Sequence, residues 1–326
     1  MLPKKFVFYF ILSGLFFVKN VFSAESFANY PQRAVRFIVP FVPGAGTDLT
    51  TRAISKKLTE QYGQQFIPDN RSGAAGAIGA DITAKANPDG YTLCLISSGH
   101  TVLSASQANL PYDLLRDLQA VTQISSLFYL LVINPQLPAK SLKELIVFAK
   151  NNPGKLTQGS SGTGALQHLS GEMLAYRAGV KFTHVPYKGG AASLAAVIAG
   201  EVDLSFTSLL SARAHIPMGR IRVLGITASK RSPVVPDIPT IAESGVLGFE
   251  ANQWYGVITS AKVPMPIVNK LSAMIQGAVH STDVVERLVY DGSIPVHSSS
   301  AEFKIHLATE ISKWRKLIKE AGLNLN

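Results

Sequence analysis

The sequence predicts an α/β protein with about two domains, and three observations support this prediction. The chain has 326 residues, which suffices for about two domains that each bury their own core. Hydrophobic residues make up 47% of it and charged residues 16%, so the chain can bury a large apolar surface. Short β-rich segments alternate with helical patterns, which is typical of βαβ units in a mostly parallel sheet.

The N-terminal segment has the features of a secretory signal peptide. A basic start at Lys4 is followed by residues 6–18, which carry no charge, and then by a polar stretch with small residues. The uncharged segment is shorter than the ~20 residues that span a bilayer, so an uncleaved anchor is the less favoured alternative. We expect cleavage near Ser23 or Ala24, which would remove residues 1–24 and leave an exported mature protein.

Local signals define the elements of the first two thirds of the chain. Ser141 and Glu144 have the spacing of a capping box at a helix start, and Gly154 stops that helix. Gly179 and Gly200 follow two further helices as C-terminal stops. The expected strands are residues 35–41, 91–97, 129–134, 157–160, 182–186, 202–206 and 222–227, and the expected helices are residues 48–62, 141–151, 163–178 and 191–199.

The C-terminal third is expected to be helical. Pro266 opens one helix at its first position, Thr282 begins another, and Ser299 with Glu302 caps the last. No long linker separates two domains, which suggests that the chain crosses between them more than once. Apolar residues recur at helical spacing in the last helix, and core packing explains them: Phe303, Leu307, Ile311, Trp314 and Leu317.

Several common chemistries are missing from the sequence. The motifs HExxH, GxxxxGK[ST] and GxSxG are absent, and the seven histidines show no pair at metal-ligand spacing. The glycine-rich residues 73–79 do not read GxGxxG, and Pro68 is expected to break the strand that a dinucleotide site needs before them. The net charge of +10 is scattered, and the single Cys94 is expected to be a buried apolar side chain. We therefore expect no catalysis, no cofactor, no metal and no nucleic-acid partner.

Two glycine-rich loops share one design and are the main candidates for a binding site. Each joins an expected strand to an expected helix, where backbone N–H groups are bared at the helix N-terminus. Such an end carries about half a positive charge and unpaired donors, so it suits a carboxylate or another small anion. Alternatively, the glycines only make tight turns and the polar residues only cap helices, which is the favoured role for Asp48. The candidates are Phe41, Gly44, Ala45, Gly46, Thr47 and Asp48 in the first loop and Ser160, Ser161, Gly162, Thr163 and Gly164 in the second.

A second group of candidates follows from position in the sheets. Ser98 and His100 follow one expected strand, and Thr207 and Ser208 follow another, at the carboxyl ends where α/β sheets bind ligands. His168 lies one turn into the helix after the second loop, where it could donate to a ligand or be an imidazole satisfied within the fold.

Several segments, in order along the mature chain, resemble the Bug family. These proteins are the periplasmic receptors of tripartite tricarboxylate transporters and are related to the citrate-binding TctC proteins. The matching segments are residues 30–52, 70–80, 87–93, 110–118, 159–174, 184–190 and 199–203.

The resemblance implies a two-lobe periplasmic binding protein of the Venus flytrap type, with the chain crossing the hinge twice. Lobe 1 would comprise residues 25–126 and 250–326, and lobe 2 residues 127–249. The resemblance also implies that residues 43–48 and 160–164 hold the carboxylates of a small organic acid between the lobes. Tyr187, in the matching segment 184–190, is a further ligand-binding candidate. The family loop commonly has glycine where this chain has Ala45, so a positive φ there would strain the alanine.

The sequence thus predicts a monomeric periplasmic receptor that is not an enzyme. It would bind a mono- or dicarboxylate and deliver it to the membrane subunits of a tripartite tricarboxylate-type transporter. The alternative is a carboxylate-sensing receptor that signals to a membrane sensor without transport. In either case, ligand contacts that exist only in the closed state must drive closure.

Overall fold

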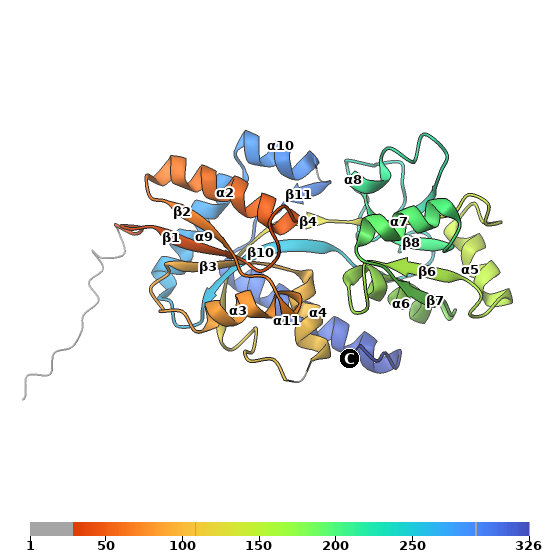
Figure 1. Cartoon of the computed structure of the whole chain (residues 1–326), viewed down its shortest axis with the longest axis horizontal. Coiled ribbons are helices and arrows are strands. Elements are labelled where there is room, and N and C mark those ends of the chain that lie inside the picture. The colour runs from red at the N-terminus through yellow and green to blue at the C-terminus, as the bar shows by residue number, and fades with distance from the viewer. Residues whose placement is uncertain (1–28, 108, 291, 326) are drawn as a thin grey trace, which may run out of the picture. The chain divides into compact units, whose positions relative to one another are not determined.

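The computed structural model describes residues 29–107, 109–290 and 292–325, and it contains two β-sheets flanked by helices (Figure 1). The expected signal peptide, residues 1–24, lies outside the described residues. Within the described part of the chain, no helix is both long and apolar enough to cross a membrane. The predicted α/β fold class with two lobes is confirmed.

The first sheet has six strands in the order β11-β4-β10-β3-β1-β2. Helices α2, α9 and α10 cover one face, and α3, α4 and α11 cover the other (Figure 1). The strands are β1 (Val35–Val39), β2 (Phe66–Asn70), β3 (Thr92–Ser97), β4 (Leu118–Leu127), β10 (Gln253–Ser260) and β11 (Ser293–Pro295). The helices are α2 (Gly46–Tyr62), α3 (Ala77–Ala84), α4 (Ser98–Ser106), α9 (Met265–Val279), α10 (Thr282–Tyr290) and α11 (Ser300–Glu320).

The second sheet has five strands in the order β7-β6-β8-β5-β9. Side chains alternate along β5: Leu131 and Ile133 pack toward α5 and α6, whereas Leu130 and Val132 pack toward α7 and α8. The strands are β5 (Tyr129–Ile133), β6 (Thr157–Ser160), β7 (Thr183–Pro186), β8 (Leu204–Ser208) and β9 (Arg222–Ile226). The helices are α5 (Leu142–Asn151), α6 (Leu166–Ala178), α7 (Gly190–Ala199) and α8 (Leu209–Ala212).

The chain crosses between the sheets twice, and this makes both sheets mixed rather than mostly parallel as expected. β4 is followed at once by β5 in the second sheet, and the chain returns between β9 and β10. The chain runs toward the second sheet at the first crossing and back toward the first sheet at the second crossing. The strands on either side of the crossings therefore pair antiparallel, β4 with β10 and β5 with β9. The two crossings are joined at Thr227, whose N–H donates to the Tyr129 carbonyl over 2.9 Å and whose Oγ1 accepts from the Tyr129 N–H over 2.8 Å.

Two local expectations were wrong, each for a backbone reason. Pro68 does not break a strand but lies within β2, an edge strand where a missing N–H costs no ladder hydrogen bond. The helix expected from Thr163 begins only at Leu166, because Gly162 and Gly164 adopt φ values of 135° and 75°, outside the helical region.

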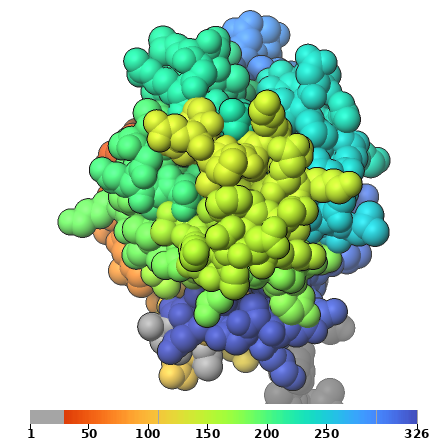
Figure 2. Space-filling view, turned by 90° about the vertical axis from the view of Figure 1, so that its right-hand side faces the viewer, coloured from red at the N-terminus to blue at the C-terminus, as the bar shows by residue number. Residues whose placement is uncertain are grey.

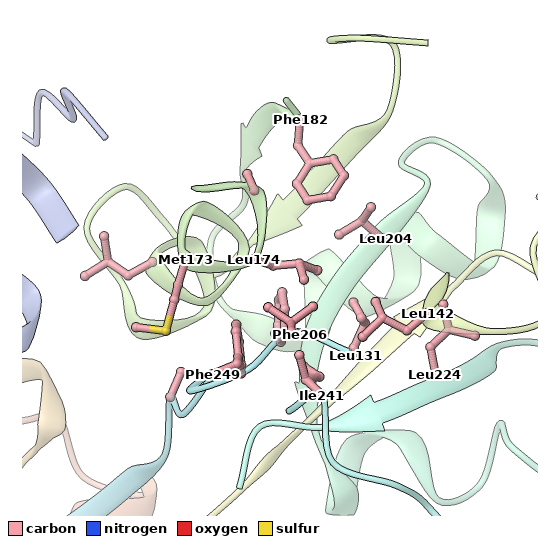
Figure 3. Packing of buried hydrophobic residues seen from close by; sticks show 14 of the residues in the cluster. Leu131, Leu142, Met173, Leu174, Phe182, Leu204, Phe206, Leu224, Ile241 and Phe249 are labelled. Carbon is pink, nitrogen blue, oxygen red and sulfur yellow. The ribbon is translucent and has the colours of Figure 1, made fainter. Parts of the chain in front are cut away.

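Apolar packing holds each sheet to its helices and also links the two sheets. Figure 3 shows the cluster in the second lobe, where Phe206 and Phe249 stack among leucines from β5, β8 and α5. The last helix, α11, contributes Phe303 to the core of the first sheet and Trp314 to this second cluster. Figure 2 accordingly shows the C-terminal segment against the lower edge of the second lobe. All five apolar residues predicted for this helix are buried, and Cys94 is buried and free, as predicted.

Candidate functional site

A cleft of about 550 Å³ lies between the two sheets and is the candidate binding site. Residues from the first sheet and its helices form one wall, and residues from the second sheet and its helices form the other. The first wall contains Gly44, Gly46, Leu49, Gln253, Tyr255, Arg287 and Tyr290, and the second contains Tyr129, Gln167, Gly190, Ala191, Thr207, Ser208, Leu210 and Ser211, with Leu127 at the crossing.

The first glycine loop presents its backbone to this cleft because Asp48 braces it from behind. The carboxylate of Asp48 accepts hydrogen bonds from the Gly44 N–H over 2.9 Å, from Arg52 Nε over 2.9 Å and from Asn70 Nδ2 over 3.0 Å. Burial opposes ionisation of Asp48, but these three donors outweigh it and lower the pKa of the carboxyl. Asp48 is therefore a buried charged brace for the loop, and it is not among the residues that line the cleft.

The alanine that departs from the family loop is not strained. Ala45 is the N-cap residue of α2 with φ −69° and ψ 160°, an ordinary extended conformation. The positive φ of this loop, 83°, falls on Gly44 instead. Gly46 packs closely against β10, since a Cβ there would lie 2.8 Å from the hydroxyl oxygen of Tyr255.

The second glycine loop is held together internally by two histidines. The N–H of Gly164 donates to Nδ1 of His168 over 3.1 Å, and the His168 ring stacks on His184 with 3.7 Å between ring centroids. Nε2 of His184 lies 2.6 Å from Oγ of Ser160, and burial with the nearby His168 lowers the pKa of His184 to about 4. The described residues that line the cleft include none of residues 160–164.

Apart from Thr207 and Ser208, the residues of the second lobe that line the cleft were not singled out from the sequence. Gly190 and Ala191 begin α7, so the N-terminus of this helix borders the cleft. Gln167 is 6% exposed, and its Oε1 has no hydrogen-bond partner among the described residues. A Cβ on Gly190 would lie 2.7 Å from Nε2 of Gln167. The paired glycines before an expected helix, at Gly189 and Gly190, were the available sequence signal for this helix start.

Some of the remaining predicted residues line the cleft and others do not. Thr207 and Ser208 line the cleft, at the carboxyl end of β8 as expected. His100 is fully buried, its Nδ1 accepts the Ser97 N–H over 3.2 Å, and burial lowers its pKa to about 4. Several others are not among the residues that line the cleft: Phe41, Ala45, Thr47, Ser98, Ser161, Thr163, His168 and Tyr187.

Comparisons with known proteins agree with this architecture. Residues 50–323 match the family described as the tripartite tricarboxylate transporter family receptor, TctC. The chain is 34% identical to BugT of Bordetella pertussis over 96% of this chain and 97% of that protein. It is 35% identical to a solved R. palustris protein with adipate, with TM-score 0.76 over 90% of this chain and 98% of that one. It is 30% identical to MatC from Rhodopseudomonas palustris with bound malate, with TM-score 0.73 over 89% of this chain and 100% of that one.

The match covers most of the chain, and the relatives align over nearly their whole length. The solved structures that the chain resembles include the periplasmic binding protein BugD, and the resemblance noted in the sequence is confirmed. The chain belongs to the TctC family of tripartite tricarboxylate transporter receptors, as a member of its Bug group.

Proposed function

We propose that this protein is a periplasmic solute-binding receptor that captures a small organic acid between its lobes and delivers it to a tripartite tricarboxylate-type membrane transporter. The observation that carries the proposal is the lining of the cleft, where the N-terminus of α2 from one lobe and that of α7 from the other border one cavity. Each end offers unpaired N–H groups and partial positive charge to an anion.

The side chains around these helix ends suit the same ligand. Hydroxyl and amide groups of Thr207, Ser208, Tyr255 and Gln167 line the cavity, and the described lining contains no aspartate or glutamate that would repel a carboxylate. The buried amide of Gln167, with its unpartnered Oε1, has hydrogen-bonding capacity for a ligand hydroxyl or an ordered water.

The relatives support the choice of an acid. Two structures with at least 30% identity to this chain were solved with adipate and with malate, both dicarboxylates. We infer that this chain binds a mono- or dicarboxylate through the starts of α2 and α7, in a mechanism that requires no catalytic group and no cofactor.

The lobes that close on the ligand would be residues 25–126 with 250–326, and residues 127–249. This division follows the order of the strands along the chain. The first sheet is built from β1–β4 and from β10 and β11, and the second sheet is built from β5–β9, which lie between them in sequence. The end of α11 packs on the second cluster through Trp314, so it would act as a brace behind the hinge. A ligand that touches both walls of the cleft would favour the closed form, because only that form makes both sets of contacts.

Thermal unfolding with a panel of organic acids, amino acids and sugars tests the proposal. A ligand at 100 times its dissociation constant that binds only the folded state adds ~2.7 kcal/mol, which raises the melting temperature by several degrees. We expect such shifts with carboxylates alone. Shifts with sugars or neutral amino acids alone would contradict the proposal.

Substitution of one glycine then locates the site. Gly46→Val places a branched side chain at the start of α2, against Tyr255, and should abolish the shift. Gly277→Val is the matched control, because Gly277 lies within helix α9 with no atom within 4 Å of its added Cβ. Equal ligand binding by both variants would place the ligand elsewhere.

Delivery to a transporter is tested in cells. Deletion of this protein should abolish uptake of the acid identified above, and reintroduction of the Gly46→Val variant should not restore it. Normal uptake combined with loss of an acid-induced transcriptional response would instead assign the protein a sensory role.

A further inference from the structure

We propose that the outer face of helix α5 binds the anionic phospholipid surface of a membrane through a cluster of lysines. This inference goes beyond the proposed function, because it concerns a surface of the second lobe that is separate from the cleft. We call this surface the α5 patch. It consists of four exposed lysines, none of which lines the cleft: Lys143, Lys150, Lys155 and Lys181.

The net charge of the protein is concentrated in the part of the chain that forms the second sheet. Residues 127–249 contain twelve lysines and arginines but only six aspartates and glutamates, which gives a net charge of +6. Residues 25–126 and 250–326 together contain sixteen lysines and arginines against fifteen aspartates and glutamates, a net charge of +1. The second lobe therefore carries nearly all of the excess positive charge of residues 25–326.

Ion pairing differs between the two lobes in the same direction. Ten of the sixteen basic side chains of the first lobe form ion pairs among the described residues. Of the twelve in the second lobe, only Arg231 does so within the described part of the chain, with Glu243. The acidic residue of α5, Glu144, instead accepts a hydrogen bond from the Lys140 backbone N–H over 2.8 Å. The charge of the α5 patch is therefore not neutralised by the acidic residues that the structure describes.

Helix α5 and the turn after it bring the four lysines to one end of the second lobe. Lys143 and Lys150 are seven residues apart, about two helical turns, so they lie on the same side of α5. Beyond the helix, the Gly154 N–H donates to the Lys181 carbonyl over 3.1 Å, which brings the backbone of Lys155 close to that of Lys181. The patch thus runs along α5 and continues past its C-terminal end, on the side of the lobe that Figure 2 faces.

The composition of the α5 patch favours a lipid surface over a protein partner. Lysine is depleted at protein–protein interfaces, where arginine and aromatic side chains are enriched. A lysine ammonium is a point charge on a flexible stem, which suits a field of many phosphate groups better than one fixed carboxylate. Clusters of about four to eight basic residues bind anionic lipid surfaces, and each lysine near such a surface strengthens binding by about fivefold.

Sedimentation with lipid vesicles tests this inference. The vesicles contain either phosphatidylcholine alone or equal parts of phosphatidylcholine and anionic phosphatidylglycerol. Residues 1–24 are omitted from the tested protein, because their apolar segment would bind any membrane. We expect binding to the anionic vesicles alone at low salt. Most of this binding should be lost at physiological salt, where exposed charges are screened over about 8 Å.

Two double variants with the same loss of charge locate the surface. Lys143→Gln with Lys150→Gln removes two lysines of the α5 patch and should weaken binding to the anionic vesicles by about 25-fold. Lys262→Gln with Lys304→Gln is the matched control, because it removes two exposed lysines of the first lobe that have no ion pair among the described residues. The control should bind nearly as tightly as the native protein. Melting temperatures of all variants are compared to show that they are folded.

A third variant keeps the test decisive if substitution within α5 impairs folding. Lys155→Gln with Lys181→Gln removes the two lysines of the patch that lie outside the helix, and a similar loss of vesicle binding is expected.

The outcomes leave no ambiguity about the patch. If the native protein does not bind anionic vesicles at low salt, or binds neutral vesicles as well, the inference is refuted and an acidic protein surface becomes the partner to test. Equal weakening by the patch variants and the control would also refute it, because total charge rather than the α5 patch would then govern binding. Acid binding in the cleft is measured separately, so either result leaves the proposed function untouched.

Discussion

The two strand-to-helix loops of this protein share a backbone plan but differ in charge. In the first, Gly44 has a φ of 83° and its N–H donates to the Asp48 carboxylate over 2.9 Å. In the second, Gly164 has a φ of 75° and its N–H donates to Nδ1 of His168 over 3.1 Å. In both, the next residue is an extended alanine N-cap with no side-chain capping bond, and the helix starts directly after it. The same turn is thus held by a carboxylate in one lobe and by an imidazole in the other.

The side chain four residues after each of these two residues also differs in charge between the loops: it is basic after Asp48 and acidic after His168. Asp48 accepts from Arg52, whereas Nε2 of His168 lies 3.4 Å from a carboxylate oxygen of Glu172. A histidine that accepts through Nδ1 must be unprotonated there, while a carboxylate accepts in its ordinary charged form at neutral pH. One backbone geometry can therefore be encoded by an acidic side chain in one loop and by a histidine in the other.

Loss of the Asp48 brace should have the largest effect. Asp48→Ala leaves the Gly44 N–H without its acceptor, in a position that is 2% exposed, and leaves the Asn70 amide with the Phe41 carbonyl as its remaining acceptor. We expect the free energy of unfolding to fall by about 2–4 kcal/mol, measured by urea denaturation at neutral pH. Ligand binding should also be lost, because the loop that lines the cleft is no longer fixed.

The control for this prediction is on the same helix. Glu60→Ala removes a carboxylate that pairs only at the surface with Lys56 and Lys57, so it should cost about 0.5 kcal/mol or less. If Asp48→Ala unfolds at the same urea concentration as Glu60→Ala, Asp48 does not brace the loop.

Acid should act selectively on the second loop through His184. Burial and the neighbouring His168 lower the pKa of His184 to about 4 in the folded protein, from 6.5 in the unfolded chain. Between these values the unfolded chain binds more protons, so stability rises with pH across this window and is lost as pH falls toward 4. Because His184 is partly exposed, we expect it to contribute about 1–2 kcal/mol of the loss rather than the full shift.

A comparison of variants isolates this contribution. His184→Gln keeps a polar partner for Ser160 but does not titrate, so its unfolding free energy should change less between neutral and acid pH than that of the native protein. The pKa of His100 in the first lobe is also lowered, to about 4, and that contribution is common to both proteins. An identical pH dependence in the two proteins would refute the role of His184.

The sequence was informative where structure is encoded locally. Ser299 and Glu302 cap α11 reciprocally as predicted, since a capping box needs only residues three apart. The two glycine loops were also found, because glycines between a strand and a helix are a local signal. Arg287 and Gln167 were missed, since their place in the cleft depends on how α10 and α6 pack against distant strands. The mixed strand directions were missed for the same reason, because β10 joins the first sheet only after the chain has built the second.

The smallest expected effect gives the sharpest comparison of the loops. Gly44→Ala and Gly164→Ala each place a methyl group at a positive φ, and neither added Cβ has an atom within 4 Å. The cost is therefore backbone strain alone, about 1 kcal/mol in each case, and urea denaturation should give similar losses for the two variants. Ligand binding should separate them, because Gly44 lines the cleft and Gly164 does not. We expect calorimetry to show a clearly weaker acid affinity for Gly44→Ala and a nearly native affinity for Gly164→Ala. The opposite order would mean that the second loop, rather than the start of α7, holds the ligand in the second lobe.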